Sequence, residues 1–261
     1  MPAPCAGAVF ADPHGVRVRD ALPGIGVSPG VAVVTGGGRG VGRATAMALA
    51  AGGHPVVIAA RSPVELETTA DEIRRAGGTV TPVVADVSRA EAVDRVFDEA
   101  RRLGPVVVLV NNAATLERAV FPQVAIEAFD RTIAVNLRGA FLCARMAFKD
   151  MVAAGGGRIV NIASLSGVAG VEKFAGLSPY VISKFGIVGL TESLAVEGAP
   201  HGIRVIGLAP GAVETQLLQR ALPGMRAGAT PADIARLIVF LLSDAAQALH
   251  GMTLPLYSNV T

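Results

Sequence analysis

Two side chains four residues apart, Tyr180 and Lys184, are the clearest candidates for acid–base chemistry in this sequence. On a helix, this spacing places both side chains on one face. A free tyrosine titrates near pH ~10, and a neighbouring ammonium group stabilises the phenolate and lowers that pKa. The phenol can then act as a general acid for a carbonyl oxygen, or as a base for an alcohol. Because the YxxxK spacing is frequent by chance, an ordinary half-exposed helix pair is the alternative.

A glycine-rich segment, Thr35 to Gly42, directly follows a short aliphatic run at 31–34. Glycine lets the backbone turn sharply and approach a pyrophosphate, and a helix that begins there offers free N–H groups and a partial positive charge. A glycine cluster alone is also consistent with a simple turn. The strand before it and the helix after it predict a dinucleotide site.

Short aliphatic runs alternate with amphipathic stretches from Val31 onward, and this alternation sets the expected architecture. The predicted strands are 31–34, 55–60, 79–85, 106–110, 158–163, 203–209 and 252–256, and the predicted helices are 41–53, 63–76, 89–103, 123–154, 179–199 and 231–243. Ser62, Ser88, Ser178 and Thr230 supply helix caps or precede first-turn prolines. We expect an α/β fold, a single-domain doubly wound parallel sheet with helices on both faces over residues 30–261, preceded by a proline-rich flexible arm at 1–29.

Composition excludes several classes of protein. The 261 residues are 51% hydrophobic and 17% charged, which argues against disorder, and the net charge of +2 is scattered, so no nucleic-acid partner is expected. The longest aliphatic run, 106–110, is far shorter than the ~20 residues of a membrane span. Cys5 and Cys143 are expected to be free thiols in the cytoplasm. No metal site is expected.

The order of these motifs resembles that of the short-chain dehydrogenases/reductases. The glycine segment reads TGxxxGxG, and NNAA at 111–114, Ser164, the YxxxK pair and Pro210-Gly211 follow in the family's order over about residues 30–256. The resemblance implies a seven-stranded Rossmann-type fold, a nicotinamide cofactor and oxidoreduction of an alcohol/carbonyl pair. It departs at Ala114, where the family's NNAG motif has glycine.

The resemblance also assigns roles to individual residues. It implies that Ser164 hydrogen-bonds the substrate oxygen, with Ser166 as a rival, that Lys184 positions the nicotinamide ribose, and that Asn136 holds a water that links the lysine to solvent. A capping or surface amide is the alternative for Asn136, and Asp86 could cap the next helix in competition with Ser88. The implied cofactor contacts are Gly36, Arg39, Gly40, Val41, Gly42, Arg61, Ser62, Asp86, Val87, Asn112, Ala113, Ala114, Tyr180, Lys184, Pro210, Gly211, Val213 and Thr215.

The residues after the second predicted strand favour NADP(H) over NAD. NAD-binding folds carry an acidic residue there for the ribose 2′-hydroxyl, whereas this chain has Arg61. A guanidinium binds a 2′-phosphate in a bidentate manner, and Arg39 in the glycine loop is a second candidate. The alternative is that both arginines are solvated surface charges.

Departures from the family pattern concern the substrate region. Only 216–222 can form a helix between Thr215 and Pro231, which predicts a short lid and an open pocket. The longer segment from Ser164 to Tyr180 adds Phe174 and Leu177, which either line the pocket mouth or pack on the protein. An open apolar pocket fits a ketoreductase of secondary metabolism, in antibiotic biosynthesis, acting on a polycyclic polyketide-like ketone.

The leading expectation is therefore NADPH-dependent reduction of a ketone with Tyr180 as the general acid. The alternatives are an NAD-linked alcohol dehydrogenase of the same family and a non-catalytic cofactor-sensing protein. The family resemblance implies a homo-oligomer, a tetramer or a dimer, built from the helices at 123–154 and 179–199. Ala140, Ala144 and Ala147 could permit that contact or could face the sheet.

Overall fold

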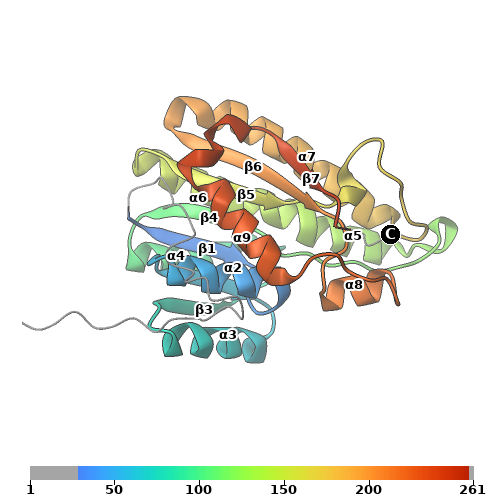
Figure 1. The fold of residues 1–261 in the computed structure, drawn as a ribbon, viewed down its shortest axis with the longest axis horizontal. Coiled ribbons are helices and arrows are strands. Elements are labelled where there is room, and N and C mark those ends of the chain that lie inside the picture. Colours follow the sequence, from blue (N-terminus) through green and yellow to red (C-terminus); the bar gives the residue numbers. More distant parts are fainter. Residues whose placement is uncertain (1–28, 259–261) are drawn as a thin grey trace, which may run out of the picture.

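The computed structural model describes residues 29–258, and seven parallel strands form one sheet within that range (Figure 1). The strands are β1 (Val31–Thr35), β2 (Val56–Ala60), β3 (Val80–Val84), β4 (Val106–Asn111), β5 (Gly157–Ile162), β6 (Ile203–Pro210) and β7 (Thr253–Leu256). Their order is β3-β2-β1-β4-β5-β6-β7, and every neighbouring pair is parallel. This confirms the predicted doubly wound Rossmann-type sheet. The order reverses between β1 and β4, and in such sheets ligands bind beyond the carboxyl ends of the strands at this point.

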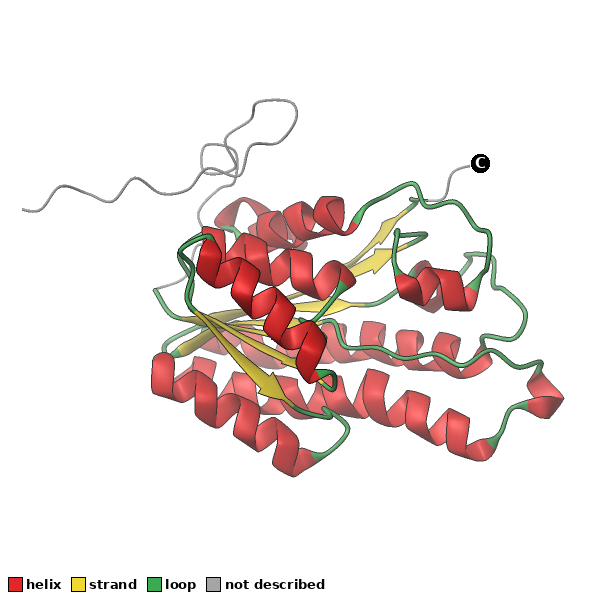
Figure 2. Ribbon diagram, turned by 90° about the horizontal axis from the view of Figure 1, so that it is seen from below, coloured by secondary structure: helices red, strands yellow, loops and turns green. Residues whose placement is uncertain are grey.

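Helices cover both faces of the sheet (Figure 2). On one face lie α2 (Gly40–Ala51), α3 (Pro63–Arg75) and α9 (Pro231–Leu242), and on the other α4 (Ala90–Leu103), α6 (Gly139–Ala153) and α7 (Ser178–Gly198). Consecutive strand residues enter different cores, Val33 with α4 and α6 and Val34 with α2 and α9. Burial on both faces explains why the strands read as continuous aliphatic runs. No helix within the described range is long and apolar enough to cross a bilayer.

The predicted helix starts are confirmed at Ser62 and Thr230 but not at Ser88. Ser62 Oγ accepts a hydrogen bond from the backbone of α3, and Thr230 forms a reciprocal capping box with Asp233. Helix α4 begins after Arg89, which makes no side-chain cap. The expectation for Ser88 was wrong because its hydroxyl donates to Asp86 Oδ1 at 2.7 Å instead.

The long helix expected at 123–154 is interrupted. The structure has a short helical turn at Phe121–Gln123, then α5 (Ile126–Ile133), a five-residue π-helical segment (Ala134–Arg138) and α6. Their apolar residues continue at helical spacing through the junction, so periodicity does not reveal it. Ala144 and Ala147 of α6 pack into the core under the sheet, and Ala140 packs with Ile187 of α7, so these alanines face the interior.

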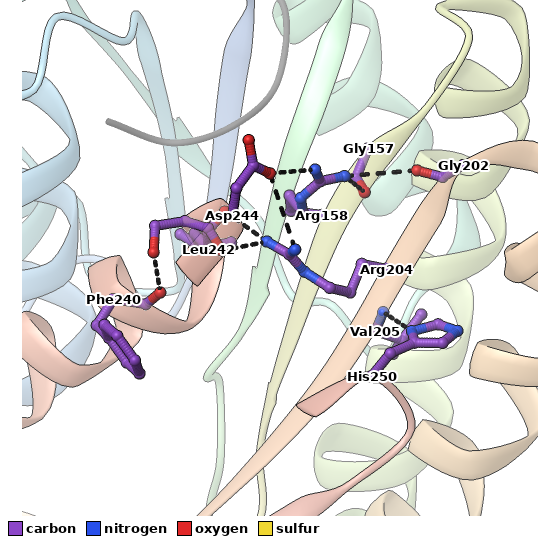
Figure 3. A network of polar contacts seen from close by, with 10 residues as sticks. Gly157, Arg158, Gly202, Arg204, Val205, Phe240, Leu242, Asp244 and His250 are labelled. Atoms are coloured by element: carbon purple, nitrogen blue, oxygen red, sulfur yellow. Dashed lines mark hydrogen bonds and ion pairs between the residues drawn. The ribbon is translucent and has the colours of Figure 1, made fainter. Parts of the chain in front are cut away.

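Two arginines on neighbouring strands tie the end of α9 to the sheet (Figure 3). Arg158 of β5 is paired in register with Arg204 of β6. Arg204 is 7% exposed and donates to the carbonyl oxygens of Leu242 at 2.9 Å and Ser243 at 2.6 Å. Arg158 Nη2 lies 3.0 Å from Asp244 Oδ1, which also faces Arg204. The Arg204 guanidinium thus satisfies carbonyls that a helix C-terminus leaves without partners, and Arg158 holds the aspartate that follows them.

The arm expected at 1–29 lies outside the described residues except for Pro29, and it stays a prediction.

Candidate active site

A cavity of about 800 Å³ opens at the carboxyl ends of β1, β2, β4, β5 and β6. It is lined by most of the residues that the sequence predicted for cofactor and catalysis: Gly36, Arg39, Gly40, Val41, Arg61, Ser62, Asp86, Val87, Asn112, Ala113, Ala114, Ser164, Tyr180, Lys184, Pro210, Gly211, Val213 and Thr215. Two predicted residues, Gly42 and Asn136, lie outside this lining. Residues from loops far apart in the sequence therefore meet at one edge of the sheet.

The glycine loop packs so tightly that three of its glycines, Gly36, Gly37 and Gly42, have no room for a side chain. Gly36 has a φ of +68°, and a Cβ there would lie 2.7 Å from Asn112 Nδ2. A Cβ on Gly42 would lie 2.2 Å from the carbonyl oxygen of Gly36. Gly42 therefore lets the first turn of α2 lie directly against the loop, and its part in a cofactor site is indirect. This cradle and the free N–H groups at the start of α2 fit a pyrophosphate.

Thr35, which the sequence analysis did not select, joins the glycine loop to the loop after β4. Its hydroxyl accepts hydrogen bonds from the backbone N–H groups of Asn112 and Ala113, both at 3.0 Å, and donates to the carbonyl oxygen of Val110 at 3.4 Å. Asn112 Nδ2 returns a hydrogen bond to the carbonyl oxygen of Thr35 at 2.9 Å. A buried polar residue at the end of a central strand was the signal that could have identified it.

The catalytic candidates come together on β5 and α7. Tyr180 lies in the first turn of α7, is half-buried and lies within reach of a hydrogen bond with Ser164, which follows β5. Lys184 lies one turn further along, 3% exposed, and its Nζ donates to the carbonyl oxygen of Ile162 at 2.7 Å. The same Nζ lies over the Tyr180 ring, 5.5 Å from its centroid. The four-residue spacing thus places both side chains on one face, as expected.

Burial dominates the electrostatics of both groups. It lowers the pKa of Lys184 from 10.5 to about 8, because a buried ammonium loses its hydration. It also raises the pKa of Tyr180 above 10, although the hydrogen bond with Ser164 acts in the opposite direction. In this structure the expected lowering of the Tyr180 pKa is therefore not found, since loss of water outweighs the stabilisation of a phenolate. A phenol with a raised pKa stays protonated at neutral pH, but it gives up its proton less readily than a free tyrosine does.

Asn136 is neither a cap nor a surface amide. It sits in the π-helical segment, is 1% exposed, and bonds Thr115 twice, through Nδ2 to the carbonyl oxygen at 2.9 Å and through Oδ1 to the N–H at 2.7 Å. Its Nδ2 also donates to Ser183 Oγ at 3.0 Å. Because Ser183 precedes Lys184, the amide connects the segment after β4 to the turn of α7 that carries Lys184.

The polar end of the cavity lies between the glycine loop and the starts of α3 and α4. Asp86 does not cap α4, and its carboxylate accepts from the backbone N–H of Ser88 at 3.0 Å. Arg61 is exposed beside Ser62. Arg39 is paired with Glu65, with Nη1 and Oε1 3.0 Å apart, so it is not a simple solvated charge.

The other end of the cavity is largely apolar. The expected short lid helix is α8 (Gln216–Ala221), and its cap is Thr215, whose hydroxyl accepts from the N–H of Leu218 at 3.2 Å. Phe174 and Leu177 both line this cavity, and Leu177 is also buried against the protein. Sequence reasoning did not single out the remaining apolar lining residues, namely Leu116, Val171, Leu217, Leu218, Leu222 and Met225.

Comparison with known proteins agrees with this architecture. The family model described as short chain dehydrogenase matches residues 30–225. The chain is 36% identical over 242 residues to the short-chain dehydrogenase/reductase eriH of Hericium erinaceus, covering 86% of this chain and 95% of that protein. It is 35% identical over 228 residues to a 3-oxoacyl-[acyl-carrier-protein] reductase of Synechocystis sp., covering 84% and 91%.

A solved structure from Beutenbergia cavernae, described as an NAD(P)-dependent gluconate 5-dehydrogenase with NADP bound at low occupancy, superimposes with a TM-score of 0.81. It is 37% identical, over 89% of this chain and 96% of that one. The fold and the site define an oxidoreductase built on a dinucleotide-binding sheet. The chain belongs to the short-chain dehydrogenase/reductase family.

Proposed function

We propose that this protein reduces a ketone to a secondary alcohol with NADPH, using Tyr180 as the general acid. The observation that carries the proposal is that Ser164, Tyr180 and Lys184 line the same cavity as the glycine loop, with the Lys184 Nζ over the Tyr180 ring, 5.5 Å from its centroid. The Synechocystis relative, named as a reductase of a 3-oxoacyl group, supports the direction of reduction.

Each of these side chains has a distinct task. NADPH, when bound, supplies the hydride. Tyr180 donates its phenolic proton to the carbonyl oxygen, and the hydroxyl of Ser164 donates a hydrogen bond to the charge that develops there, an effect worth a few kcal/mol, about 3, in comparable sites. The ammonium of Lys184, over the ring, stabilises the phenolate that remains. Asn136 acts as a positioning residue because it connects Thr115 to the turn that carries Lys184.

The variant Tyr180→Phe tests this mechanism. It should lower kcat at least about a hundredfold, as expected for loss of a general acid, while NADPH still binds. Tyr257→Phe is the matched control, because the other tyrosine is 70% exposed and lies outside the cavity lining. Near-normal turnover by Tyr180→Phe would remove Tyr180 from its role, and an inactive parent protein that binds NADPH would favour the cofactor-sensing alternative.

The preference for NADP(H) rests on Arg39 and Arg61 at the polar end of the cavity and on the absence of an acidic residue at the end of β2. The Beutenbergia cavernae structure, described as NAD(P)-dependent, has NADP bound at low occupancy and is compatible with this preference. The measurement is kcat/KM with NADPH and with NADH. A higher value with NADH would favour the alternative, an NAD-linked alcohol dehydrogenase.

The substrate is proposed to be a bulky polycyclic, polyketide-like ketone, as in secondary metabolism and antibiotic biosynthesis. The apolar lining, which includes Phe174, Leu222 and Met225, and the six-residue α8 support a wide, open entrance. A panel of flat polycyclic ketones, small aliphatic ketones and sugars, followed by NADPH absorbance, tests this. Activity confined to the small substrates would contradict it.

A homo-oligomer, tetramer or dimer, is proposed in the cytoplasm. Phe141 on α6 and Phe185 and Val196 on α7 are exposed, and a groove between the two helices is lined by Phe148 and Leu194. Such an apolar surface is typical of a subunit contact. The compartment rests on Cys143, a buried free thiol. Light scattering after gel filtration measures the subunit number, and a monomer at micromolar concentration would contradict the assembly.

A further inference from the structure

A carboxylate stands at the point where an NADP-binding site should be positively charged. Glu65, in the first turn of α3, lines the cavity beside Arg39 and Arg61. Its Oε1 lies 3.0 Å from Arg39 Nη1, and the same nitrogen donates to Gln216 Oε1 at 3.0 Å. Both N–H groups of Nη1 are therefore directed to protein acceptors.

The location of Glu65 is fixed by its backbone and not only by its ion pair. Its N–H donates to Ser62 Oγ at 3.3 Å, and a Cβ added to Gly38 would lie 3.0 Å from the Glu65 Cβ. The side chain is 33% exposed. Glu65 is thus held between the glycine loop and the residues that follow β2, where the adenosine ribose of a dinucleotide is bound in such folds.

The two nicotinamide cofactors differ in what they present to this corner. A 2′-phosphate carries a charge of about −1.5 to −2, competes for Arg39 and is repelled by a carboxylate. The ribose hydroxyl of NADH is neutral and can donate a hydrogen bond to a carboxylate. The Glu65 carboxylate therefore weakens the binding of NADPH and is compatible with the binding of NADH.

We propose that Glu65 is a specificity-determining residue that limits the preference for NADPH by holding Arg39. Arg61 is exposed and attracts the 2′-phosphate. Glu65 does not compete directly with the phosphate for this arginine. This inference rests on the proposed function, since it requires a nicotinamide dinucleotide in the cavity. Glu65, an acidic residue outside the catalytic candidates, would then set the ratio of the affinities for NADPH and NADH.

The variant Glu65→Gln tests the proposal, because the amide keeps the shape and an acceptor for Arg39 but removes the charge. Titration of each cofactor by fluorescence should show that the Kd for NADPH falls about threefold to tenfold, while the Kd for NADH changes by less than about twofold. Glu67→Gln is the matched control. Glu67 also lies on α3 and pairs with an arginine, Arg74, and neither residue lines the cavity, so its removal should leave the ratio of the two Kd values unchanged.

Two further measurements identify the cause as charge. Gln216→Leu removes the neutral acceptor and should change the Kd for NADPH less than Glu65→Gln does. Raising the salt concentration from 0.05 M to about 0.5 M should reduce the effect of Glu65→Gln, because exposed charges are screened.

The outcomes separate this inference from the proposed function. A parent protein that binds NADH more tightly contradicts the NADPH preference, yet a lower NADPH Kd in Glu65→Gln still supports the role of Glu65. An unchanged ratio of Kd values in Glu65→Gln, or an equal change of that ratio in Glu67→Gln, overturns the inference whichever cofactor the parent prefers. Failure of the parent to bind either cofactor overturns both.

Discussion

Replacing the buried Lys184 by methionine should remove activity and at the same time make the protein more stable at neutral pH. The side chain is 3% exposed, and burial lowers its pKa from 10.5 to about 8. At pH 7 the folded protein must therefore keep an ammonium in a site that disfavours it. The pKa difference corresponds to about 3 kcal/mol, at about 1.4 kcal/mol for each pKa unit.

Methionine has a similar length and no charge, so Lys184→Met removes this cost. It also loses the hydrogen bond to the carbonyl oxygen of Ile162, worth about 1 kcal/mol. The net expectation is a gain of about 2 kcal/mol in the free energy of unfolding, or a rise in Tm of about 4 to 8 °C.

The pH dependence provides the decisive measurement. Between about pH 8 and 10.5, the unfolded chain holds a proton on Lys184 that the folded protein has lost, so the stability of the parent rises with pH. The advantage of Lys184→Met should be complete below about pH 8 and be lost before pH 10.5, where the missing hydrogen bond to Ile162 leaves the variant about 1 kcal/mol less stable than the parent. Urea unfolding at several pH values measures it, with Lys149→Met, at an exposed lysine of α6, as the control. A variant that is less stable than the parent at pH 7, or a stability difference that does not change over this pH range, would refute the reasoning.

Two further substitutions test parts of the fold that position the site. Gly42→Ala introduces a Cβ 2.2 Å from the carbonyl oxygen of Gly36, so the loop must shift. We expect thermal unfolding to show a loss of about 1 to 3 kcal/mol in stability, and titration to show an at least tenfold higher Kd for NADPH. Unchanged binding would contradict the tight packing. Arg204→Met leaves the carbonyl oxygens of Leu242 and Ser243 without their donor and should lower the free energy of unfolding in urea by about 2 to 4 kcal/mol, with the KM for NADPH unchanged. A change in the KM for NADPH that, expressed as a free energy, exceeds the loss of unfolding free energy would show that the contacts of Arg204 extend to the cavity.

Much of this structure could be predicted because the relevant signals are local. Continuous aliphatic runs indicate strands that are covered on both faces. The glycine loop can be recognised from its composition. Ser62 and Thr230 cap their helices because their neighbours in sequence are also their partners in space. The juxtaposition of Tyr180 with Lys184 follows from helical spacing alone.

The remaining features depend on contacts between distant residues, which no local pattern contains. Arg39 is paired with Glu65, 26 residues away, and with Gln216, 177 residues away, so its availability to a phosphate could not be judged from the glycine motif. The π-helical segment around Asn136 is hidden because apolar spacing continues through it. The direction of the Tyr180 pKa depends on how far the folded protein removes water from the hydroxyl, which is a property of packing.

The hydroxyl of Thr35 has a consequence for how quickly and how tightly a nucleotide can be captured. With two backbone N–H groups directed to its oxygen and its own proton directed to Val110, every hydrogen-bonding capacity of this group is used before any ligand arrives. The glycine loop and the loop after β4 are thus preorganised for a pyrophosphate. Their conformational entropy is lost when the chain folds and not when the nucleotide binds. The association rate should then be limited by diffusion and by the orientation of the incoming nucleotide, with little delay from rearrangement of these loops.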